Sequence, residues 1–334
     1  MVMKNLITLF CTSIAIGIFA IPAKAGSTPK LAPELQDQCS TEVKEALYAS
    51  FLQNRQNEQL KAYDAAKKYL ACPTSGVTEA QQKIIDYLNK WTKLYEKERG
   101  KQRLIVDIYE KRDLLDAYRV AKEVFANDPD NLQALVHLGA IAYQVVLLNN
   151  PTLNQEGLGY AKKALEALEA GQNLEDWSPL QGRELAIAYL NYSIGALSLE
   201  AEPRKALSYL LKSTQAETPL KKSPYTYAYI AGAYETGDYA KLSADYKRDY
   251  SGKDETAESK VALANISQLV DRMIDGYARA VALAGNDAQF AKPKAEWMES
   301  LNTWYKFRFP DGSLDELIKN ILSKPLPPAP TPIK

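Results

Sequence analysis

Pro129 constrains the fold more than any other residue, because it separates two stretches of helical character. Residues 113–127 before it and 131–148 after it carry apolar side chains three and four positions apart, as the buried face of an α-helix requires. Proline lacks an amide N–H and crowds the preceding turn, so a helix ends before it. Asp130 or Asn131 can then cap the next helix with a side-chain oxygen. The segment predicts two helices joined by a tight turn.

The same apolar spacing continues along most of the chain. Strand-like alternation is rare, and glycine and proline fall mostly between the periodic segments. A long amphipathic segment runs from Thr78 to Gly100, where the glycine either breaks or bends the helix. Further helices are expected at 40–53, 57–71, 102–111, 156–170, 180–200, 203–216, 223–236, 238–250, 257–285, 291–307 and 312–323. The sequence therefore predicts an all-α protein.

The residues around Pro129 resemble the tetratricopeptide repeat. Leu135, Leu138 and Gly139 match the large apolar residue and the Leu-Gly pair in the first helix of that repeat. Ala117 and Pro129 match the alanine of the second helix and the proline that ends it. Gly139 and Ala117 are both small, as is required where two antiparallel helices approach closely.

Weaker copies of this pattern occur elsewhere in the chain. Gly237, Asp238 and Tyr239 match the hairpin turn that is typical of the repeat, whereas residues 147–157 lengthen another hairpin beyond the usual period. Residues 40–250 thus resemble a divergent tetratricopeptide-like array. The resemblance implies antiparallel helical hairpins stacked as a right-handed solenoid, and an irregular helical bundle is the alternative.

The first 25 residues have the pattern of a secretory signal. Lys4 precedes an apolar core from Leu6 to Ile21, and small residues stand at Ala23 and Ala25, where signal peptidase requires them. A retained anchor helix is the alternative, because the apolar run is close to the length that spans a bilayer. We divide the chain into a signal peptide (1–25), a linker (26–38), a helical repeat domain with C-terminal capping helices (39–323) and a Pro-rich disordered tail (324–334). The mature chain is then periplasmic or extracellular and has no membrane span.

The charge balance argues against a nucleic-acid partner. Without Lys4 and Lys24 the chain has 39 basic and 41 acidic residues, whereas phosphate binding needs a surplus of lysine and arginine. Removing the signal also leaves two cysteines, Cys39 and Cys72, in an oxidising compartment. They flank the first predicted helical pair, and antiparallel helices bring those ends together. We expect a disulfide between them.

Residues that could support catalysis or bind a metal are sparse. His137 is the only histidine, and no cysteine lies near it in sequence, so we expect a partly exposed helix residue rather than a metal ligand or a catalytic base. Phosphate-binding loops, nucleophile elbows and Cys-x-x-Cys pairs do not occur. Asn265-Ile-Ser267 matches a glycosylation acceptor but lies in a predicted helix interior, which indicates a chance match. The sequence predicts no enzyme, no metal site and no cofactor.

Tyrosine is unusually frequent, with 21 residues against 7 phenylalanines. The repeat resemblance places the first helix of each pair on a concave surface, where rigid aromatic rings suit a protein or peptide partner. The expected binding residues are Gln133, Val136, Ala140, Tyr143, Gln144, Tyr227, Ala231, Tyr234 and Glu235. Packing between helices is the alternative for Tyr227 and Tyr234, since a buried ring can keep its hydroxyl wet. Trp297, Leu301 and Trp304 have the spacing of a core or capping face.

These observations favour an exported helical scaffold that mediates protein or peptide interactions. An obligate accessory subunit of an envelope or extracellular assembly is the second hypothesis. Fold alone does not decide between the two.

Overall fold

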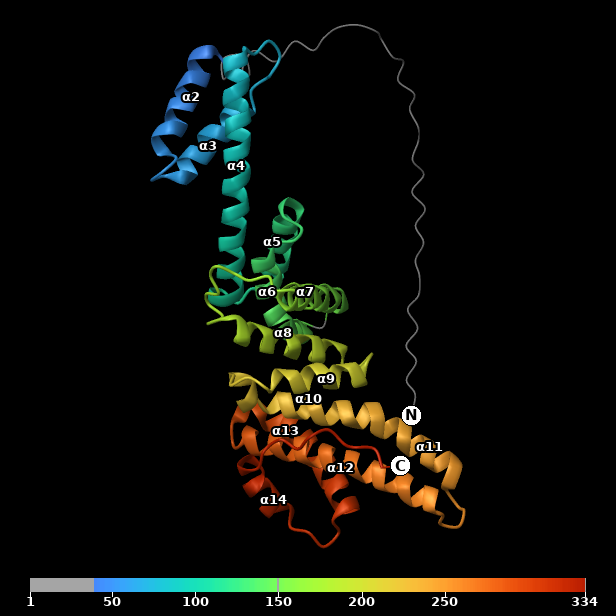
Figure 1. Cartoon of the computed structure of the whole chain (residues 1–334). Coiled ribbons are helices and arrows are strands. Elements are labelled where there is room, and N and C mark those ends of the chain that lie inside the picture. The colour runs from blue at the N-terminus through green and yellow to red at the C-terminus, as the bar shows by residue number, and fades with distance from the viewer. Residues whose placement is uncertain (1–38, 149, 334) are drawn as a thin grey trace, which may run out of the picture. The chain divides into compact units, whose positions relative to one another are not determined.

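The computed structural model describes residues 39–148 and 150–333 of the 334-residue chain. Within these ranges the protein is helical and has no β-strand, as the sequence predicted (Figure 1). The predicted signal peptide (1–25) and linker (26–38) lie outside the described residues. The chain forms two compact units, the first ending at Thr92 and the second beginning at Lys93.

The first unit is a small helical assembly around one aromatic core. It comprises α2 (Thr41–Asn54), α3 (Gln59–Leu70) and the first half of α4 (Glu79–Ile105). The fully buried Phe51 meets the ring of Trp91 edge-on, with centroids 5.0 Å apart. Alanines on α3 let α2 and α3 pack closely, because they are buried and have no bulky side chain.

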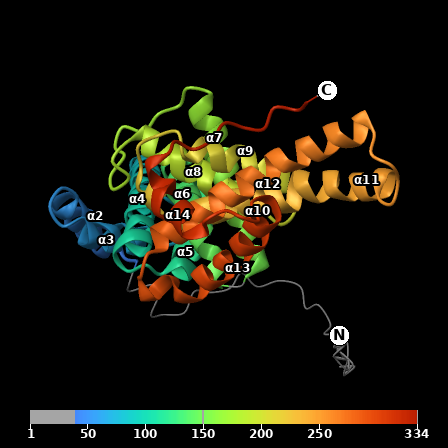
Figure 2. The ribbon, with the colours of Figure 1, turned by 90° about the horizontal axis from the view of Figure 1, so that it is seen from below.

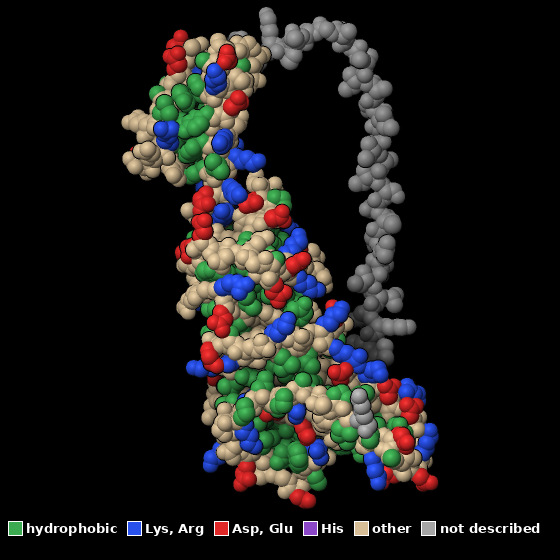
Figure 3. Space-filling view, in the orientation of Figure 1, with side chains coloured by type: hydrophobic (Ala, Val, Ile, Leu, Met, Phe, Trp, Pro, Cys, Tyr) green, Lys and Arg blue, Asp and Glu red, His purple; other side chains and the backbone are tan. Residues whose placement is uncertain are grey.

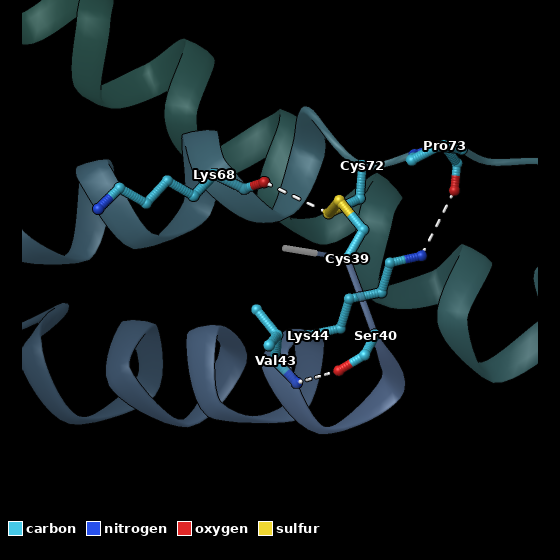
Figure 4. The surroundings of a disulfide bond; sticks show 7 residues. All are labelled: Cys39, Ser40, Val43, Lys44, Lys68, Cys72 and Pro73. Carbon is cyan, nitrogen blue, oxygen red and sulfur yellow. Dashed lines mark hydrogen bonds between the residues drawn. A yellow bond between two sulfur atoms is a disulfide. The ribbon is translucent and has the colours of Figure 1, made fainter. Parts of the chain in front are cut away.

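A disulfide closes the open end of this first helical pair. Cys39 and Cys72 are bonded, with their Cα atoms 5.6 Å apart, which confirms the predicted pairing (Figure 4). Beside it, Ser40 caps α2 by accepting a hydrogen bond from the backbone N–H of Val43 at 3.3 Å. Lys44 donates to the carbonyl of Pro73 at 3.4 Å, so the bond and its surroundings tie the start of α2 to the end of α3.

The second unit contains the rest of α4 and ten further α-helices among its described residues. They are α5 (Leu114–Asn127), α6 (Leu132–Ile141), α7 (Pro151–Glu169), α8 (Arg183–Ser198), α9 (Pro203–Ser213), α10 (Pro224–Tyr234), α11 (Ala240–Tyr250), α12 (Ala257–Ala284), α13 (Ala291–Arg308) and α14 (Leu314–Asn320). Single π-helical turns occupy Val106–Glu110 and Glu235–Tyr239, and 3₁₀ turns occupy Ala142–Leu148, Pro219–Lys222, Ala288–Phe290 and Ile321–Ser323. From α6 to α10 each helix packs against the next along the chain, and α12 packs against both α10 and α13. In both views α11 and the start of α12 project together from the rest of this unit (Figures 1 and 2).

Small residues allow the helices of the second unit to approach closely. A Cβ added at Gly139 on α6 would lie 2.7 Å from the Cα of Ala161 on α7. One added at Gly276 on α12 would lie 2.9 Å from the Cβ of Ala231 on α10. Since real Cβ atoms do not approach so closely, backbone contact between helices depends on glycine at these positions.

The boundary predicted at Pro129 is confirmed. Helix α5 ends at Asn127, and α6 begins after Asn131, whose side chain accepts a hydrogen bond from the N–H of Ala134 at 2.9 Å. The expected core role of the Trp297 and Leu301 face is also confirmed, because both side chains are buried among residues of α12 and α10.

Some local expectations differ from the structure. Of the two alternatives at Gly100 the break is excluded, because α4 continues through it. A Cβ at this glycine would lie only 3.1 Å from a methyl of Val124, so the glycine serves packing. The helix expected at 156–170 begins earlier, since α7 starts at Pro151. Asn150 caps that helix by accepting from the N–H groups of Thr152 and Leu153, and proline fits its first turn.

The predicted hairpin turn at Gly237-Asp238-Tyr239 is also wrong. The chain remains helical from Pro224 to Tyr250, and the π-helical turn Glu235–Tyr239 absorbs one extra residue between α10 and α11. Gly237 is buried against Pro203 and the start of Arg204 at the beginning of α9. Packing at this point therefore outweighs the turn propensity of Gly-Asp.

The Pro-rich C-terminal segment, for which the sequence predicted a disordered tail, lies along α12 and hydrogen-bonds to it. Residues 324–333, which we call the tail, run beside this helix (Figure 1). Their backbone groups exchange hydrogen bonds with side chains of Asn265, Gln268, Arg272 and Arg279. The tail has few apolar side chains to bury, and its contacts with α12 are made through its backbone.

Candidate functional site

The second unit contains a cavity of about 280 Å³ with tyrosine walls, which we call the tyrosine pocket. It lies where α6, α8, the π-helical turn after α4 and the loop between α7 and α8 meet. The lining residues are Tyr109, Ala140, Ile141, Tyr143, Gln144, Pro179, Leu180, Gln181, Leu185, Tyr189 and Pro219. The pocket combines apolar surface with hydroxyl and amide groups, as ligand sites in proteins commonly do.

Ser193 fixes the wall that carries Tyr143 and Gln144. This buried serine on α8 donates to the carbonyl of Ala140 and accepts from the N–H of Tyr143, both at 3.2 Å. Ser193 thereby satisfies two backbone hydrogen-bonding groups where α6 ends and the 3₁₀ turn begins. Gln144 donates to the hydroxyl of Tyr143 at 3.1 Å, which leaves its amide oxygen for another partner.

Tyr109 of the pocket wall contacts a buried histidine. The hydroxyl of Tyr109 lies 3.0 Å from Nδ1 of His137, and the two rings meet edge-on. Burial lowers the pKa of His137 to about 4, and burial raises the pKa of Tyr109. Both groups are therefore neutral at pH 7, and the contact between them is polar but uncharged.

His137 was expected to be partly exposed, and the structure places it in the core. Its side chain is fully buried, and every residue from Ala134 to Ile141 is buried. Helix α6 is apolar on nearly every side and packs against α5, α7 and α8. A histidine inside such a helix must use its neighbours for hydrogen bonding, and Tyr109 supplies that contact.

A row of tyrosine rings extends from the pocket along α8 and α10. Tyr143 stacks on Tyr189 at 6.3 Å and meets Tyr192 edge-on at 5.0 Å. Tyr192 in turn stacks on Tyr229, which contacts Tyr225, each with centroids 6.1 Å apart. Tyr192 is buried, whereas the other four are partly exposed. The row forms a stiff aromatic band beside the pocket.

The rim of the pocket contains a strained backbone position. Gln181 has φ +56°, a left-handed conformation that is unfavourable for a residue with a Cβ. The side chain of Arg183 donates to the carbonyl of Leu168 at 2.8 Å and ties the end of this loop to α7. Strained positions that the surrounding structure enforces are frequent at binding sites.

The first predicted group of binding residues is partly brought together here. Ala140, Tyr143 and Gln144 line the pocket. Gln133 is half-buried and Val136 is fully buried against α7 and α8, so neither belongs to the lining. Tyr109, Gln181 and Tyr189 were not identified from the sequence. These three residues are far apart in sequence, so no local pattern connects them. The high frequency of tyrosine was the one signal in the sequence that pointed to such a site.

The second predicted group does not line this pocket. Tyr227, Ala231 and Tyr234 are buried between α10 and α12, and the hydroxyl of Tyr227 donates to the carbonyl of Lys221. Glu235 accepts a hydrogen bond from Tyr277 of α12 at 2.6 Å. The packing interpretation of Tyr227 and Tyr234 is thus confirmed, because Gly276 lets α12 cover that face of α10.

The described residues were searched for a metal-binding group and for a membrane-spanning helix. Among them, no three His, Cys, Asp or Glu side chains converge in a group that could hold a metal ion. None of the helices in residues 39–148 and 150–333 combines the length and apolar character of a membrane span. Acidic and basic side chains are interspersed on the face shown in Figure 3.

Comparison with known family models, curated proteins and solved structures finds no match to this chain.

Proposed function

We propose that the protein is an exported helical scaffold without enzymatic activity, which binds a protein or peptide partner in the tyrosine pocket. In this proposal the second unit is a divergent tetratricopeptide-like array of helical hairpins stacked as a right-handed solenoid. The pocket is the observation that carries the proposal, because it gathers Tyr109, Tyr143 and Tyr189 around an amide with a free oxygen.

Recurring close contacts support the hairpin array. Gly139 on α6 meets Ala161 on α7, and Gly195 on α8 meets Leu210 on α9, where a Cβ would lie 2.6 Å away. Both pairs are consecutive helices with a glycine on the first member. The tetratricopeptide repeat also places small residues where its two helices cross.

The size of the pocket selects the class of ligand. Cavities for drug-sized molecules usually measure about 300–1,000 Å³. A volume of about 280 Å³ lies just below that range, so it suits one large side chain or two small ones. An apolar or aromatic anchor residue of a longer peptide fits this volume, and the row of tyrosine rings offers contact area for the residues beside it.

Export is supported by two independent features. The N-terminal sequence has the order of charge, apolar core and small residues of a secretory signal. The Cys39–Cys72 disulfide suits an oxidising compartment.

An obligate subunit of an envelope or extracellular assembly is the second candidate. Phe307 and Phe309 favour it, because 61% and 40% of these residues are exposed near the end of α13. Permanent interfaces commonly cover such side chains.

Selection of peptides on the purified protein tests the proposed function. A phage-displayed library of random dodecapeptides should yield binders whose affinity falls about 30-fold in a Tyr189→Ala variant, as expected for a hot-spot tyrosine. Tyr250→Ala is the matched control, because that tyrosine lies on α11 and outside the pocket. Circular dichroism should show unchanged helicity in both variants. Equal affinities for the two variants would exclude the tyrosine pocket as the binding site.

A further inference from the structure

Four polar side chains form a stripe along α12. Asn265, Gln268, Arg272 and Arg279 are spaced by three, four and seven residues, which places them on one face of the helix. Each of them hydrogen-bonds to the backbone of the tail. We call these four residues the α12 stripe. None of them lines the tyrosine pocket, so this feature is independent of the proposed function.

Two amide side chains of the stripe each recognise one complete backbone unit of the tail. Asn265 donates to the carbonyl of Ile333 at 3.0 Å and accepts from its N–H at 2.7 Å. Gln268 donates to the carbonyl of Thr331 at 3.0 Å and accepts from its N–H at 3.1 Å. A neighbouring β-strand would satisfy an extended chain in the same way. The amides therefore recognise an extended backbone and not particular side chains.

Two arginines hold the earlier part of the tail by its carbonyls. Arg272 donates to Pro328 at 2.7 Å, and Arg279 donates to Lys324 at 2.9 Å and Pro325 at 2.8 Å. Residues further along α12 bind residues nearer the start of the tail, so the tail runs antiparallel to α12.

Arg279 is a built part of this site. Its side chain is only 6% exposed, and its Nε lies 2.6 Å from a carboxylate oxygen of Asp275. Its guanidinium also lies over the ring of Tyr227, 5.7 Å from the centroid. A buried arginine needs acceptors for its donors, and the carbonyls of Lys324 and Pro325 accept from Nη2 of Arg279.

The tail sequence suits recognition through the backbone. Prolines at 325, 327, 328, 330 and 332 leave N–H donors between 325 and 333 only at Leu326, Ala329, Thr331 and Ile333. The stripe accepts from Thr331 and Ile333, the two donors nearest the end. Proline also restricts the unbound segment to extended conformations, so little entropy is lost on docking.

The tail does not fill the groove over which it lies. A hollow of about 530 Å³ remains between it and helices α9, α10, α11 and α12. Its lining is largely apolar and consists of Arg204, Leu207, Ser208, Leu211, Tyr234, Asp238, Leu242, Asn265, Leu269, Ala329, Pro330 and Pro332. The tail presents only the small Ala329 and two prolines to this space. A related peptide with a larger apolar side chain can bury more surface there.

We propose that the α12 stripe is a docking site for an extended, proline-containing peptide, and that the tail is its resident intramolecular occupant. The peptide partner keeps N–H groups at alternate positions for Asn265 and Gln268. It carries a larger apolar side chain where the tail has Ala329, and it displaces the end of the tail when it binds.

The test uses full-length protein and a fluorescent synthetic peptide of the tail sequence, KPLPPAPTPIK. Replacing Thr331→Pro and Ile333→Pro in the protein removes both N–H donors and should release the end of its own tail. Replacing Thr331→Ala and Ile333→Ala keeps the donors and is the matched control. Fluorescence anisotropy should show the peptide binding the proline variant at least tenfold more tightly than the alanine variant or the wild type. Equal binding to the two variants would overturn the proposal.

Two further measurements locate the site. In the proline variant, Asn265→Leu with Gln268→Leu should abolish peptide binding while circular dichroism stays unchanged, and retained binding would contradict the assignment. A peptide with Phe in place of Ala329 should bind at least threefold more tightly than the tail sequence. Weaker binding would argue against the hollow as the binding site of that side chain. Light scattering should show a monomeric wild type, because a tail-dependent dimer would mean that the tail belongs on a second copy.

Discussion

The two units of the chain stabilise helix pairs by different means. In the described part of the first unit, residues 39–92, a few aromatic and alanine side chains surround Phe51, and a covalent bond closes the pair. In the described part of the second unit, residues 93–148 and 150–333, larger buried cores continue from helix to helix, and the helices cross at glycine and alanine residues. Small assemblies bury too little surface to be stable alone and often depend on crosslinks. Larger ones can depend on fit between neighbouring helices.

The comparison predicts that the disulfide matters only in the first unit. The bond joins residues 33 positions apart, and loops of that length stabilise a fold by about 3–4 kcal/mol through the entropy of the unfolded chain. Replacing Cys39→Ala and Cys72→Ala should therefore unfold α2 and α3 at much lower urea concentrations than wild type. Hydrogen exchange read by mass spectrometry should show lost protection in peptides covering α2 and α3.

Peptides from α8 and α9 serve as the internal control for this experiment, and their protection should be unchanged. Similar loss of protection in both regions would show that the two units do not unfold independently. Undiminished protection of α2 and α3 would show that the aromatic core suffices without the bond.

The second unit should be more sensitive to acid because of His137. Its pKa is about 4 in the folded protein against an ordinary value of 6.5, since burial disfavours the charged ring. The unfolded chain thus binds a proton as the pH falls below 6.5, while the folded protein stays neutral until about pH 4. Stability is therefore lost as the pH falls through this interval, by roughly 3 kcal/mol in all.

A His137→Asn variant isolates this contribution. Asparagine does not titrate, and its side-chain oxygen can take the place of Nδ1 opposite the hydroxyl of Tyr109. Urea unfolding between pH 6.5 and 4 should show a shallower loss of stability in the variant than in wild type. Parallel pH profiles would mean that His137 titrates alike in both states.

The smallest expected effect probes the contact between α10 and α12. An added Cβ at Gly276 would lie 2.9 Å from both the carbonyl oxygen of Tyr227 and the Cβ of Ala231. Gly276→Ala should therefore cost about 1–3 kcal/mol through overpacking. Gly232→Ala is the control, because nothing lies within 4 Å of its added Cβ, and it should stabilise by about 0.5–1 kcal/mol. Thermal unfolding measures both, and equal shifts would remove the argument for glycine-dependent packing.

Local rules predicted much of the helical framework. Proline and its capping partner marked the boundary between α5 and α6, and apolar spacing located most of the other helices. The disulfide followed from placing Cys39 and Cys72 at the ends of one helical pair. These features depend on residues that are near one another in sequence, so each can be predicted from its own segment.

The remaining features depend on contacts between distant segments. The Gly-Asp pair at 237–238 favours a turn by itself, and only its position beside α9 keeps it helical. His137 is buried because α6 has partners on several sides. Tyr109, Tyr143 and Tyr189 form one pocket although 80 residues separate the first from the last, and no spacing rule connects them. The role of Asn265 is not visible in its own segment, because its partner Ile333 lies 68 positions further along the chain.

The buried contact between Arg279 and the carbonyls of Lys324 and Pro325 turns the tail into a tethered competitor. When the last residues of the tail dissociate from Asn265 and Gln268, Arg279 still binds the start of the tail. The dissociated end therefore stays close to its binding site. Such short tethers give local concentrations on the order of millimolar. A peptide present at micromolar concentration must then bind the open stripe roughly a thousandfold more tightly than the tail does in order to occupy it equally. The arginine thereby sets an affinity threshold below which other proline-containing segments are ignored.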